Sequence, residues 1–233
     1  MTEDTTSKRA RTFPSARSPA RILVVDDHPI VRNGLVQLLS QETDLTVCAE
    51  AGSARDAEAA VEKHDPHLIM LDISLEGTNG IELTRRIRSF NPDIKVLILS
   101  MHDENLYAKR ALRAGARGYV TKREPPDHVI DAIRQVLGGA LYVSSAVVTD
   151  IIHDFAVGAP TQDAQDGVAS LSDRELQIFE LIGNGHSTRE IAGLLNLSPK
   201  TIESHRAHIK RKLGVHTSVE LTHYAIRWSE EDR

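Results

Sequence analysis

Five short apolar segments alternate with helical patterns over the first 140 residues, and this alternation constrains the fold most strongly. The apolar segments lie at 21–25, 44–51, 67–72, 94–100 and 116–120. Helical patterns occupy the intervals at 30–39, 54–63, 81–89, 105–113 and 126–137. Strands and helices that alternate in this way form an open parallel sheet with helices on both faces. We therefore predict a doubly wound, five-stranded parallel sheet between residues 21 and 140.

The first apolar segment ends on two adjacent acids, in the sequence RILVVDDHPI. Its residues 22–25 are all branched and apolar, as in a strand that is buried on both faces. Asp26 and Asp27 follow directly, although like charges repel each other and are costly to remove from water. A cation near the end of this strand would relieve the repulsion.

Polar residues also follow the other predicted strands. Asp72 ends the third strand, Ser100 ends the fourth, and Lys122 follows the fifth. Ligands of open α/β sheets bind at the carboxyl ends of the strands, so we expect these side chains to meet Asp26 and Asp27 there. Three carboxylates together favour Mg²⁺, which prefers carboxylate, water and phosphate oxygens. One carboxylate could then attack phosphorus, while the lysine and the hydroxyl hold the phosphoryl oxygens.

These residues stand in four motifs that together resemble a known family. DDHP follows the first strand, LDISLEGTNGIEL surrounds Asp72, LSMHDE follows the fourth strand, and GYVTK follows the fifth. In this combination, residues 20 to 140 resemble the receiver domain of two-component response regulators. The resemblance implies a flavodoxin-like α/β sheet with the strand order 2-1-3-4-5.

The resemblance further implies that Asp72 accepts a phosphoryl group from a sensor histidine kinase. Mg²⁺ would be held by oxygen ligands around the acceptor, from Asp26, Asp27, Asp72 and the backbone carbonyl of Ser74. Ser100 and Lys122 would contact the phosphoryl group, and Tyr119 would turn inward together with Ser100. These movements would change the surface formed by the fourth helix, the fifth strand and the fifth helix.

Two positions depart from the pattern of the family. Glu76 and Arg123 stand where many receivers have proline. Gly77 and Gly80 still permit a tight turn after Asp72, so we expect function to be retained.

The remaining residues divide into a tail, a linker and a second domain. Residues 1–20 are rich in Thr, Ser, Pro and Arg without an apolar period, which predicts a disordered tail. The predicted linker covers 141–170, with a short amphipathic helix at 147–155 and a small, polar stretch at 157–170. From 171 to 228 only helical patterns occur, which predicts a compact all-α domain.

Capping residues mark the helix starts of the second domain. Three starts have a capping box, in which a hydroxyl and a glutamate satisfy each other's backbone amides: Ser172 with Glu175, Ser187 with Glu190, and Thr217 with Glu220. A fourth start combines Ser198 with Pro199. The sequence therefore predicts four short helices.

The third of these helices, at 200–213, has an apolar and a basic side. At 100° per residue the side facing the core would contain Ile202, His205, Ile209 and Leu213. Between 198 and 214 a single acid, Glu203, accompanies five basic residues: Lys200, Arg206, Lys210, Arg211 and Lys212. A cationic helix after a short helix at 189–195 and a tight turn predicts a helix-turn-helix that places this helix in the major groove of DNA.

The sequence LSDRELQIFELIGNGHSTREIAGLLNLSPKTIESHRAHIKRKLGV resembles the LuxR-type DNA-binding domain over nearly its full length. With the receiver, the whole chain resembles a response regulator of the NarL/FixJ class. By this resemblance the positions that face the bases are Glu203, Ser204 and Ala207. The positions that suit DNA phosphates are Lys200, Thr201, His205, Lys210 and Arg211. The resemblance also implies a homodimer on paired half-sites of double-stranded DNA, formed through the final helix at 218–227. Packing in the core of the domain could explain some of the same apolar residues.

Composition excludes several other classes of protein. The net charge is −5, so the basic helix is a local feature of an acidic chain. Cys48 is the only cysteine, which excludes a disulfide framework and a multi-cysteine zinc site. No apolar run is long enough to span a membrane, and the N-terminus lacks the apolar core of a signal peptide. We expect a cytoplasmic protein without a membrane partner.

The leading hypothesis is a phosphorylation-dependent DNA-binding transcription regulator of a two-component system. It would be no enzyme, except in catalysing its own phosphorylation and dephosphorylation. One alternative keeps both domains but makes DNA binding constitutive and independent of Asp72. A second alternative is a Mg²⁺-dependent aspartyl-phosphate phosphotransferase acting on a separate substrate, which would leave the DNA-binding domain unexplained.

Overall fold

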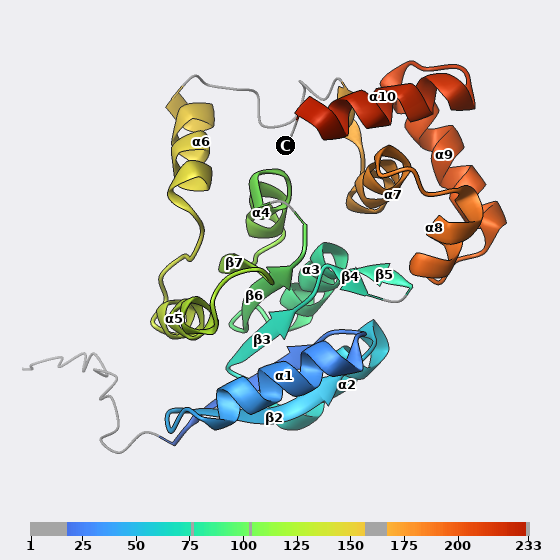
Figure 1. The fold of residues 1–233 in the computed structure, drawn as a ribbon. Helices are drawn as coiled ribbons and strands as arrows, with labels where there is room; N and C mark the ends of the chain where they lie inside the picture. Colours follow the sequence, from blue (N-terminus) through green and yellow to red (C-terminus); the bar gives the residue numbers. More distant parts are fainter. Residues whose placement is uncertain (1–17, 76, 103, 157–166, 232–233) are drawn as a thin grey trace, which may run out of the picture.

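The computed structural model describes residues 18–75, 77–102, 104–156 and 167–231, which fold into a sheet domain and a helical domain (Figure 1). The main sheet has five strands: β1 (Ala20–Val25), β2 (Leu45–Ala51), β3 (Leu68–Leu71), β6 (Lys95–Ser100) and β7 (Gly118–Thr121). Their order is β2-β1-β3-β6-β7, and all neighbours are parallel. Because β6 and β7 are the fourth and fifth strands of the predicted sheet, the predicted order 2-1-3-4-5 is confirmed.

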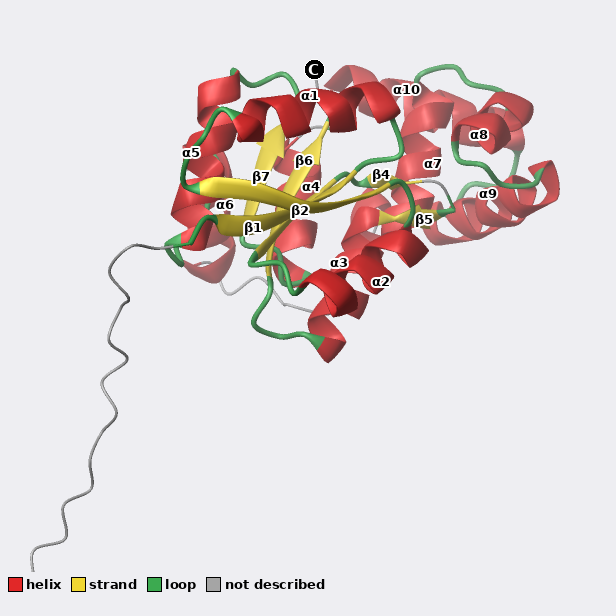
Figure 2. Cartoon of the chain, turned by 90° about the horizontal axis from the view of Figure 1, so that it is seen from below, coloured by secondary structure: helices red, strands yellow, loops and turns green. Residues whose placement is uncertain are grey.

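Five helices cover the two faces of this sheet (Figure 2). One face packs against α1 (Pro29–Ser40) and α5 (Pro126–Leu137), and the other against α2 (Ala54–His64), α3 (Gly80–Phe90) and α4 (Glu104–Arg113). Along β1, Ile22 and Val24 belong to the apolar cluster with α1 and α5, whereas Leu23 and Val25 belong to the cluster on the other face. The strand is therefore buried on both faces, as its unbroken apolar sequence predicts.

A second, two-stranded sheet follows β3 and was not predicted. It pairs β4 (Ser74–Leu75) with β5 (Thr78–Asn79) in antiparallel orientation. A Cβ atom at Gly80 would collide with the backbone carbonyl oxygen of Asp72, so the chain can return this closely only with glycine there. Asn79 caps α3 by accepting a hydrogen bond from the Ile81 amide at 2.8 Å. The tight turn expected from the glycines is thus the end of a small hairpin, while Glu76 lies outside the described residues.

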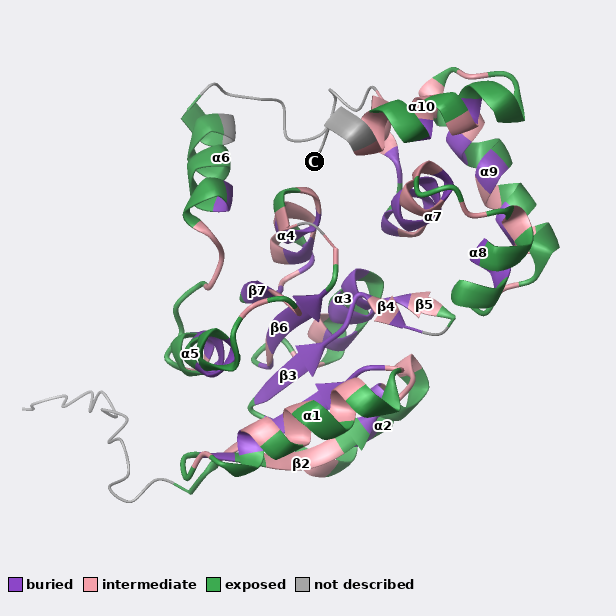
Figure 3. Ribbon diagram, in the orientation of Figure 1, coloured by how far each residue is buried: buried purple, intermediate pink, exposed green. Residues whose placement is uncertain are grey.

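The predicted linker contains two helical pieces. The helix α6 (Ser145–Ala156) lies beside α4, with Lys109 Nζ 3.3 Å from the Asp150 carboxylate (Figure 1). Most of α6 is exposed to solvent (Figure 3). The 3₁₀ helix η1 (Gly167–Ser170) lies against the helical domain, where the Ser170 carbonyl accepts a hydrogen bond from Lys212. Residues 157–166 of the linker, and residues 1–17 of the predicted tail, lie outside the described part of the chain.

The second domain consists of four α-helices after η1, as predicted. They are α7 (Asp173–Gly183), α8 (Thr188–Leu194), α9 (Pro199–Leu213) and α10 (Ser218–Glu231). The capping boxes at Ser172 and Ser187 are formed, and Ser198 caps α9 with Pro199 at its first position. At the start of α10 the Thr217 amide donates to the Glu220 carboxylate, and the Glu220 amide donates to the Thr217 hydroxyl. None of the helices described in either domain is long and apolar enough to cross a membrane.

Candidate functional site

The carboxylates predicted at the strand ends meet at one edge of the sheet. One oxygen each of Asp26, Asp27 and Asp72 and a ring nitrogen of His28 all lie within 4.8 Å of one another. Lys122 extends into this group from the loop after β7, with Nζ 2.6 Å from Asp26 Oδ2 and 2.8 Å from Asp72 Oδ2. The side chains of Asp26 and Asp72 are almost fully buried, at 2% and 3% exposure, so the lysine charge partly compensates two charges held away from water.

Burial and charge act in opposite directions on this group. Desolvation raises the pKa of the Asp72 carboxyl above its usual value, although the charge and hydrogen bond of Lys122 oppose that shift. Desolvation would lower the pKa of Lys122, but the charge of Asp72 and the hydrogen bonds to Asp26 and Asp72 outweigh it and raise that pKa. The site therefore keeps its lysine charged, while burial disfavours the ionised form of Asp72.

The donors in this group fit a hard divalent cation. Asp27 Oδ1 is buried and forms no hydrogen bond, although His28 Nδ1 lies 2.7 Å away. A buried carboxylate oxygen without a donor is costly unless a cation binds it. Carboxylate oxygens from Asp26, Asp27 and Asp72 match the preference of Mg²⁺, and Ser74, whose carbonyl completes the predicted set, begins β4 two residues after Asp72.

The two residues predicted to change on phosphorylation, Ser100 and Tyr119, both contact His102. Ser100 is fully buried at the end of β6, and its Oγ accepts a hydrogen bond from the His102 amide at 3.3 Å. Tyr119 of β7 is 1% exposed, and its hydroxyl donates to the His102 carbonyl at 2.9 Å. The aromatic side chain therefore already points inward in this structure.

His28 and His102 also belong to this site, although they were not predicted from the sequence. His28 donates its backbone amide to Asp26 Oδ1 at 2.8 Å and so fixes the orientation of that carboxylate. His102 Nε2 lies 2.9 Å from Ser74 Oγ, which joins the loops after β3 and β6. Both histidines stand inside the motifs DDHP and LSMHDE, but neither motif indicates which partner the ring contacts.

The second candidate site is the exposed side of α9. Among the positions predicted to contact DNA, Lys200, Glu203, Ser204, Ala207 and Arg211 are exposed, and Thr201, His205 and Lys210 are partly buried. Thr201 shares a hydrogen bond with Ser198, and Glu203 accepts one from Thr188 of α8 at 2.7 Å. Burial lowers the pKa of His205, which the nearby Arg174 charge lowers further. The solvent-facing side of α8 and α9 is visible in Figure 3.

Two of the five basic residues counted on α9 have structural roles: one is buried, and the other binds the start of α7. Arg206 is buried at 9% exposure. Lys212 donates to Glu175 Oε2 at 2.6 Å and to the Ser170 carbonyl at 3.1 Å, which ties α9 to the start of α7. The basic surface of this helix therefore consists of Lys200, Lys210 and Arg211.

The final helix divides its apolar residues between core and surface. Leu221 and Ala225 are fully buried, whereas Val219 is 66% and Ile226 37% exposed. Core packing therefore explains only the first pair and leaves the second pair available to a partner.

Together, the two sites define a class of protein. A buried carboxylate next to a lysine at the edge of a doubly wound sheet can accept a phosphoryl group, and a capped basic helix after a short helix can enter a DNA groove. A chain with both is a DNA-binding regulator with a phosphorylation domain.

Comparison with known proteins identifies the family. The model of the response regulator receiver domain matches residues 22–134, and that of the bacterial regulatory proteins of the luxR family matches residues 169–225. The chain is 38% identical to the response regulator UvrY of Escherichia coli, over 88% of this chain and 93% of that protein. It is 35% identical to the oxygen regulatory protein NreC of Staphylococcus carnosus, over 89% of this chain and 97% of that protein.

A solved structure of RcsB from Salmonella enterica serovar Typhimurium, bound to the promoter rprA with the phosphomimetic BeF₃⁻, is similar over most of both chains. It covers 89% of this chain and 98% of that one, with 26% identity and a TM-score of 0.58. The chain belongs to the two-component response regulators that join a receiver domain to a LuxR-type DNA-binding domain. It is thus a phosphorylation-dependent DNA-binding transcription regulator, as the leading hypothesis from the sequence states.

Proposed function

We propose that Asp72 is the residue that accepts the phosphoryl group, from the phosphohistidine of a sensor histidine kinase. A carboxylate oxygen of Asp72 attacks phosphorus, and the bond between phosphorus and the histidine nitrogen of the kinase breaks. The observation that carries this proposal is the contact between Asp72 Oδ2 and Lys122 Nζ at 2.8 Å, with Asp26 Oδ2 on the same amine. Lys122 is therefore within reach of both the nucleophile and the phosphoryl oxygens.

The other residues of the site take supporting roles in this proposal. Asp26, Asp27, Asp72 and the carbonyl of Ser74 hold Mg²⁺. The ion supplies positive charge that neutralises the carboxylates and the phosphoryl oxygens. Ser100, buried at the end of β6, turns its hydroxyl toward the phosphoryl group, and Tyr119 follows it.

The DNA partner is double-stranded DNA, which α9 contacts through the exposed residues described above. Lys200, Lys210 and Arg211 suit phosphates, as do Thr201 and His205, while Glu203, Ser204 and Ala207 face the bases. We further propose that the active form is a homodimer on paired half-sites, because α10 leaves Val219 and Ile226 exposed. The chain then works in the cytoplasm, where DNA and kinase domains meet, and its catalysis is limited to gaining and losing its own phosphoryl group.

The test is the intact mass of the protein after incubation with Mg²⁺ and acetyl phosphate, a small phosphodonor. Wild type is expected to gain the mass of one phosphoryl group, and Asp72→Asn none. Asp44→Asn, which removes an exposed carboxylate of the same domain, serves as the matched control and should behave like wild type. A phosphoryl group that remains on Asp72→Asn would refute the assignment.

A further inference from the structure

The backbone of His102 forms hydrogen bonds with both residues that are proposed to respond to phosphorylation. Its backbone amide donates to Ser100 Oγ at 3.3 Å, and its carbonyl accepts from the Tyr119 hydroxyl at 2.9 Å. Its ring Nε2 lies 2.9 Å from Ser74 Oγ, on the loop that leaves Asp72. A movement of Ser100, Tyr119 or Ser74 therefore acts on one residue, through its backbone or its ring.

The opposite ring nitrogen of His102 contacts the DNA-binding domain. Nδ1 lies 3.0 Å from Glu180 Oε2 of α7, and the Tyr107 hydroxyl of α4 donates to the same oxygen at 2.6 Å. The rings of His102 and Tyr107 also pack together, with centroids 4.7 Å apart. Desolvation and the charge of Glu180 raise the pKa of Tyr107, so its hydroxyl remains a donor.

The hydrogen bonds form one connected chain across the two domains. Gln177 of α7 donates to Ser74 Oγ at 3.1 Å. The Ser74 hydroxyl can then donate to His102 Nε2, and a proton on Nδ1 of the ring satisfies Glu180. Two of the side chains in this arrangement, Gln177 and Glu180, come from the DNA-binding domain.

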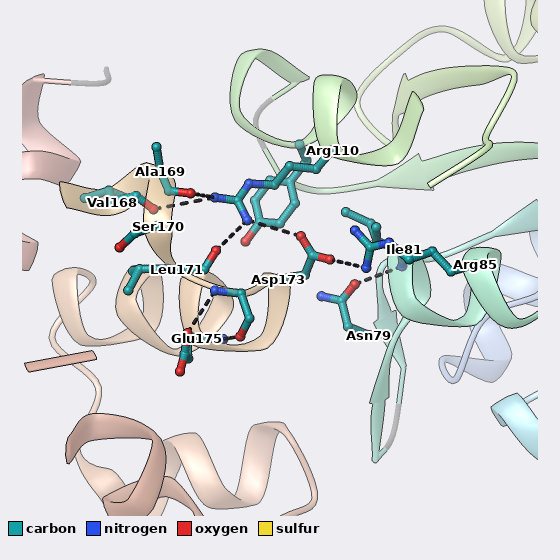
Figure 4. Close-up of polar contacts among 12 residues, drawn as sticks. Asn79, Ile81, Arg85, Arg110, Val168, Ala169, Ser170, Leu171, Asp173 and Glu175 are labelled. Atoms are coloured by element: carbon teal, nitrogen blue, oxygen red, sulfur yellow. Dashed lines mark hydrogen bonds and ion pairs between the residues drawn. The ribbon is translucent and has the colours of Figure 1, made fainter. Parts of the chain in front are cut away.

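Two arginines of the receiver fix the start of the same helix (Figure 4). Arg85 of α3 lies 2.8 Å from Asp173 Oδ2, and Arg110 of α4 lies 3.2 Å from Asp173 Oδ1. Arg110 also donates to the carbonyl of Leu171 at 2.7 Å. Asp173, Gln177 and Glu180 are spaced by four and three residues and thus share one face of α7, which lies against the receiver.

This contact leaves the DNA-reading side of α9 uncovered. Lys200, Ser204 and Arg211 are exposed while α7 is docked. A cleft borders the contact of His102 with Glu180, lined by Glu104 of the receiver and Trp228 of the DNA-binding domain. The contact of α7 with the receiver therefore acts on the phosphorylation site and does not cover the residues of α9 that would bind DNA.

We propose that His102 is a positioning residue that links the phosphorylation site to the DNA-binding domain, and that docking of α7 through Glu180 slows phosphorylation of Asp72. This inference rests on the proposed function of Asp72. While Glu180 holds the ring, the backbone of His102 holds Ser100 Oγ, which must turn away to meet an incoming phosphoryl group. Phosphorylation, in turn, withdraws Ser100 from His102 and weakens the hold on α7, because coupling between two sites is reciprocal.

The test is the rate at which the full chain gains a phosphoryl group from acetyl phosphate, measured for four variants. Glu180→Gln weakens the contact from the DNA-binding side, and His102→Ala removes the link on the receiver side. The third variant combines the two, and Asp150→Asn, which alters the exposed partner of Lys109 on α6, is the matched control. Small-angle scattering of each variant reports whether the domains separate.

Glu180→Gln is expected to separate the domains and to speed phosphorylation about tenfold if nine in ten molecules are docked. In the His102→Ala background the same change is expected to have no further effect on the rate. Glu180 touches no reacting group, so a purely structural role in its own domain would leave the rate at Asp72 unchanged.

Three results would overturn the inference. Domains that separate in Glu180→Gln without a faster reaction would show that docking does not restrain the site. An equal acceleration in the His102→Ala background would show that another residue provides the link, and His102→Gln gives the same comparison if the alanine variant does not fold. If neither wild type nor any variant gains a phosphoryl group, the proposed function is refuted together with the inference. By contrast, a gain by Glu180→Gln where wild type gains none would support the inference.

Discussion

Lys122 is the residue on which the charge balance of the phosphorylation site depends. It is 10% exposed and contacts two carboxylates that are themselves almost fully buried. Removing one partner of a buried ion pair leaves an uncompensated charge, which costs far more than the pair itself contributes. The same amine is therefore needed both for the stability of the apo site and for its chemistry.

Lys122→Met is expected to lower the free energy of unfolding by about 3 kcal/mol when Mg²⁺ is absent, because Asp26 and Asp72 then face each other unpaired. Mg²⁺ should restore part of this loss, since a ligand that binds only the folded state stabilises it. Urea unfolding with and without Mg²⁺ measures both effects. Lys63→Met, at an exposed position of α2, is the control. A loss for Lys122→Met no larger than that of the control would contradict the account.

At the scale of single residues, the sequence predicts the acids, the hydroxyl and the lysine because they interrupt buried apolar strands. Asp26, Asp72 and Ser100 are polar residues at the ends of buried strands, where packing alone would favour apolar side chains. Their position therefore indicates a functional site. His102 gives no such signal, since it lies in a loop, where a polar side chain is ordinary, and its partner Glu180 is 78 residues further along the chain.

At the scale of elements, α9 shows how periodicity separates two faces without identifying their partners. Ile202 and Ile209 were correctly predicted on the core side. Arg206 and Lys212 were counted with the basic surface, because the spacing of charges does not reveal that Glu175 and the Ser170 carbonyl bind Lys212. The hairpin of β4 and β5 was missed for a related reason, since strands of two residues have no period.

Two neighbouring basic residues of α9 are expected to behave differently. Arg211→Ala should reduce the magnitude of the slope of log affinity for DNA against log salt by about 0.9 per chain bound, because one phosphate contact is lost. Lys212→Ala should leave this slope nearly unchanged but lower the stability of the helical domain by about 1 kcal/mol, through the loss of its hydrogen bond to Glu175. Fluorescence anisotropy at several salt concentrations measures the first effect, and urea unfolding followed by Trp228 fluorescence measures the second. Equal slopes for Arg211→Ala and wild type would contradict the assignment of the basic surface.

At the scale of the whole molecule, the arrangement of the two domains could not be predicted from the sequence. Asp173, Gln177 and Glu180 form a polar face on α7 that would be expected to be exposed, yet Asp173 and Gln177 are buried at 8% and 2% exposure. Their burial depends on Arg85, Arg110 and Ser74, which lie far away in the chain. No local pattern shows which surfaces of two domains will meet.

The central claim, that phosphorylation of Asp72 controls DNA binding, is tested most directly by the affinity of the full chain for DNA in two states. The probe is a duplex selected by the protein itself from a random library, and the protein is measured with Mg²⁺, with and without acetyl phosphate. We expect phosphorylated wild type to bind at least about tenfold more tightly, which is about 1.4 kcal/mol. Asp72→Asn should bind equally in both conditions. Equal affinities for unphosphorylated and fully phosphorylated wild type would contradict the account and favour a regulator that binds DNA constitutively.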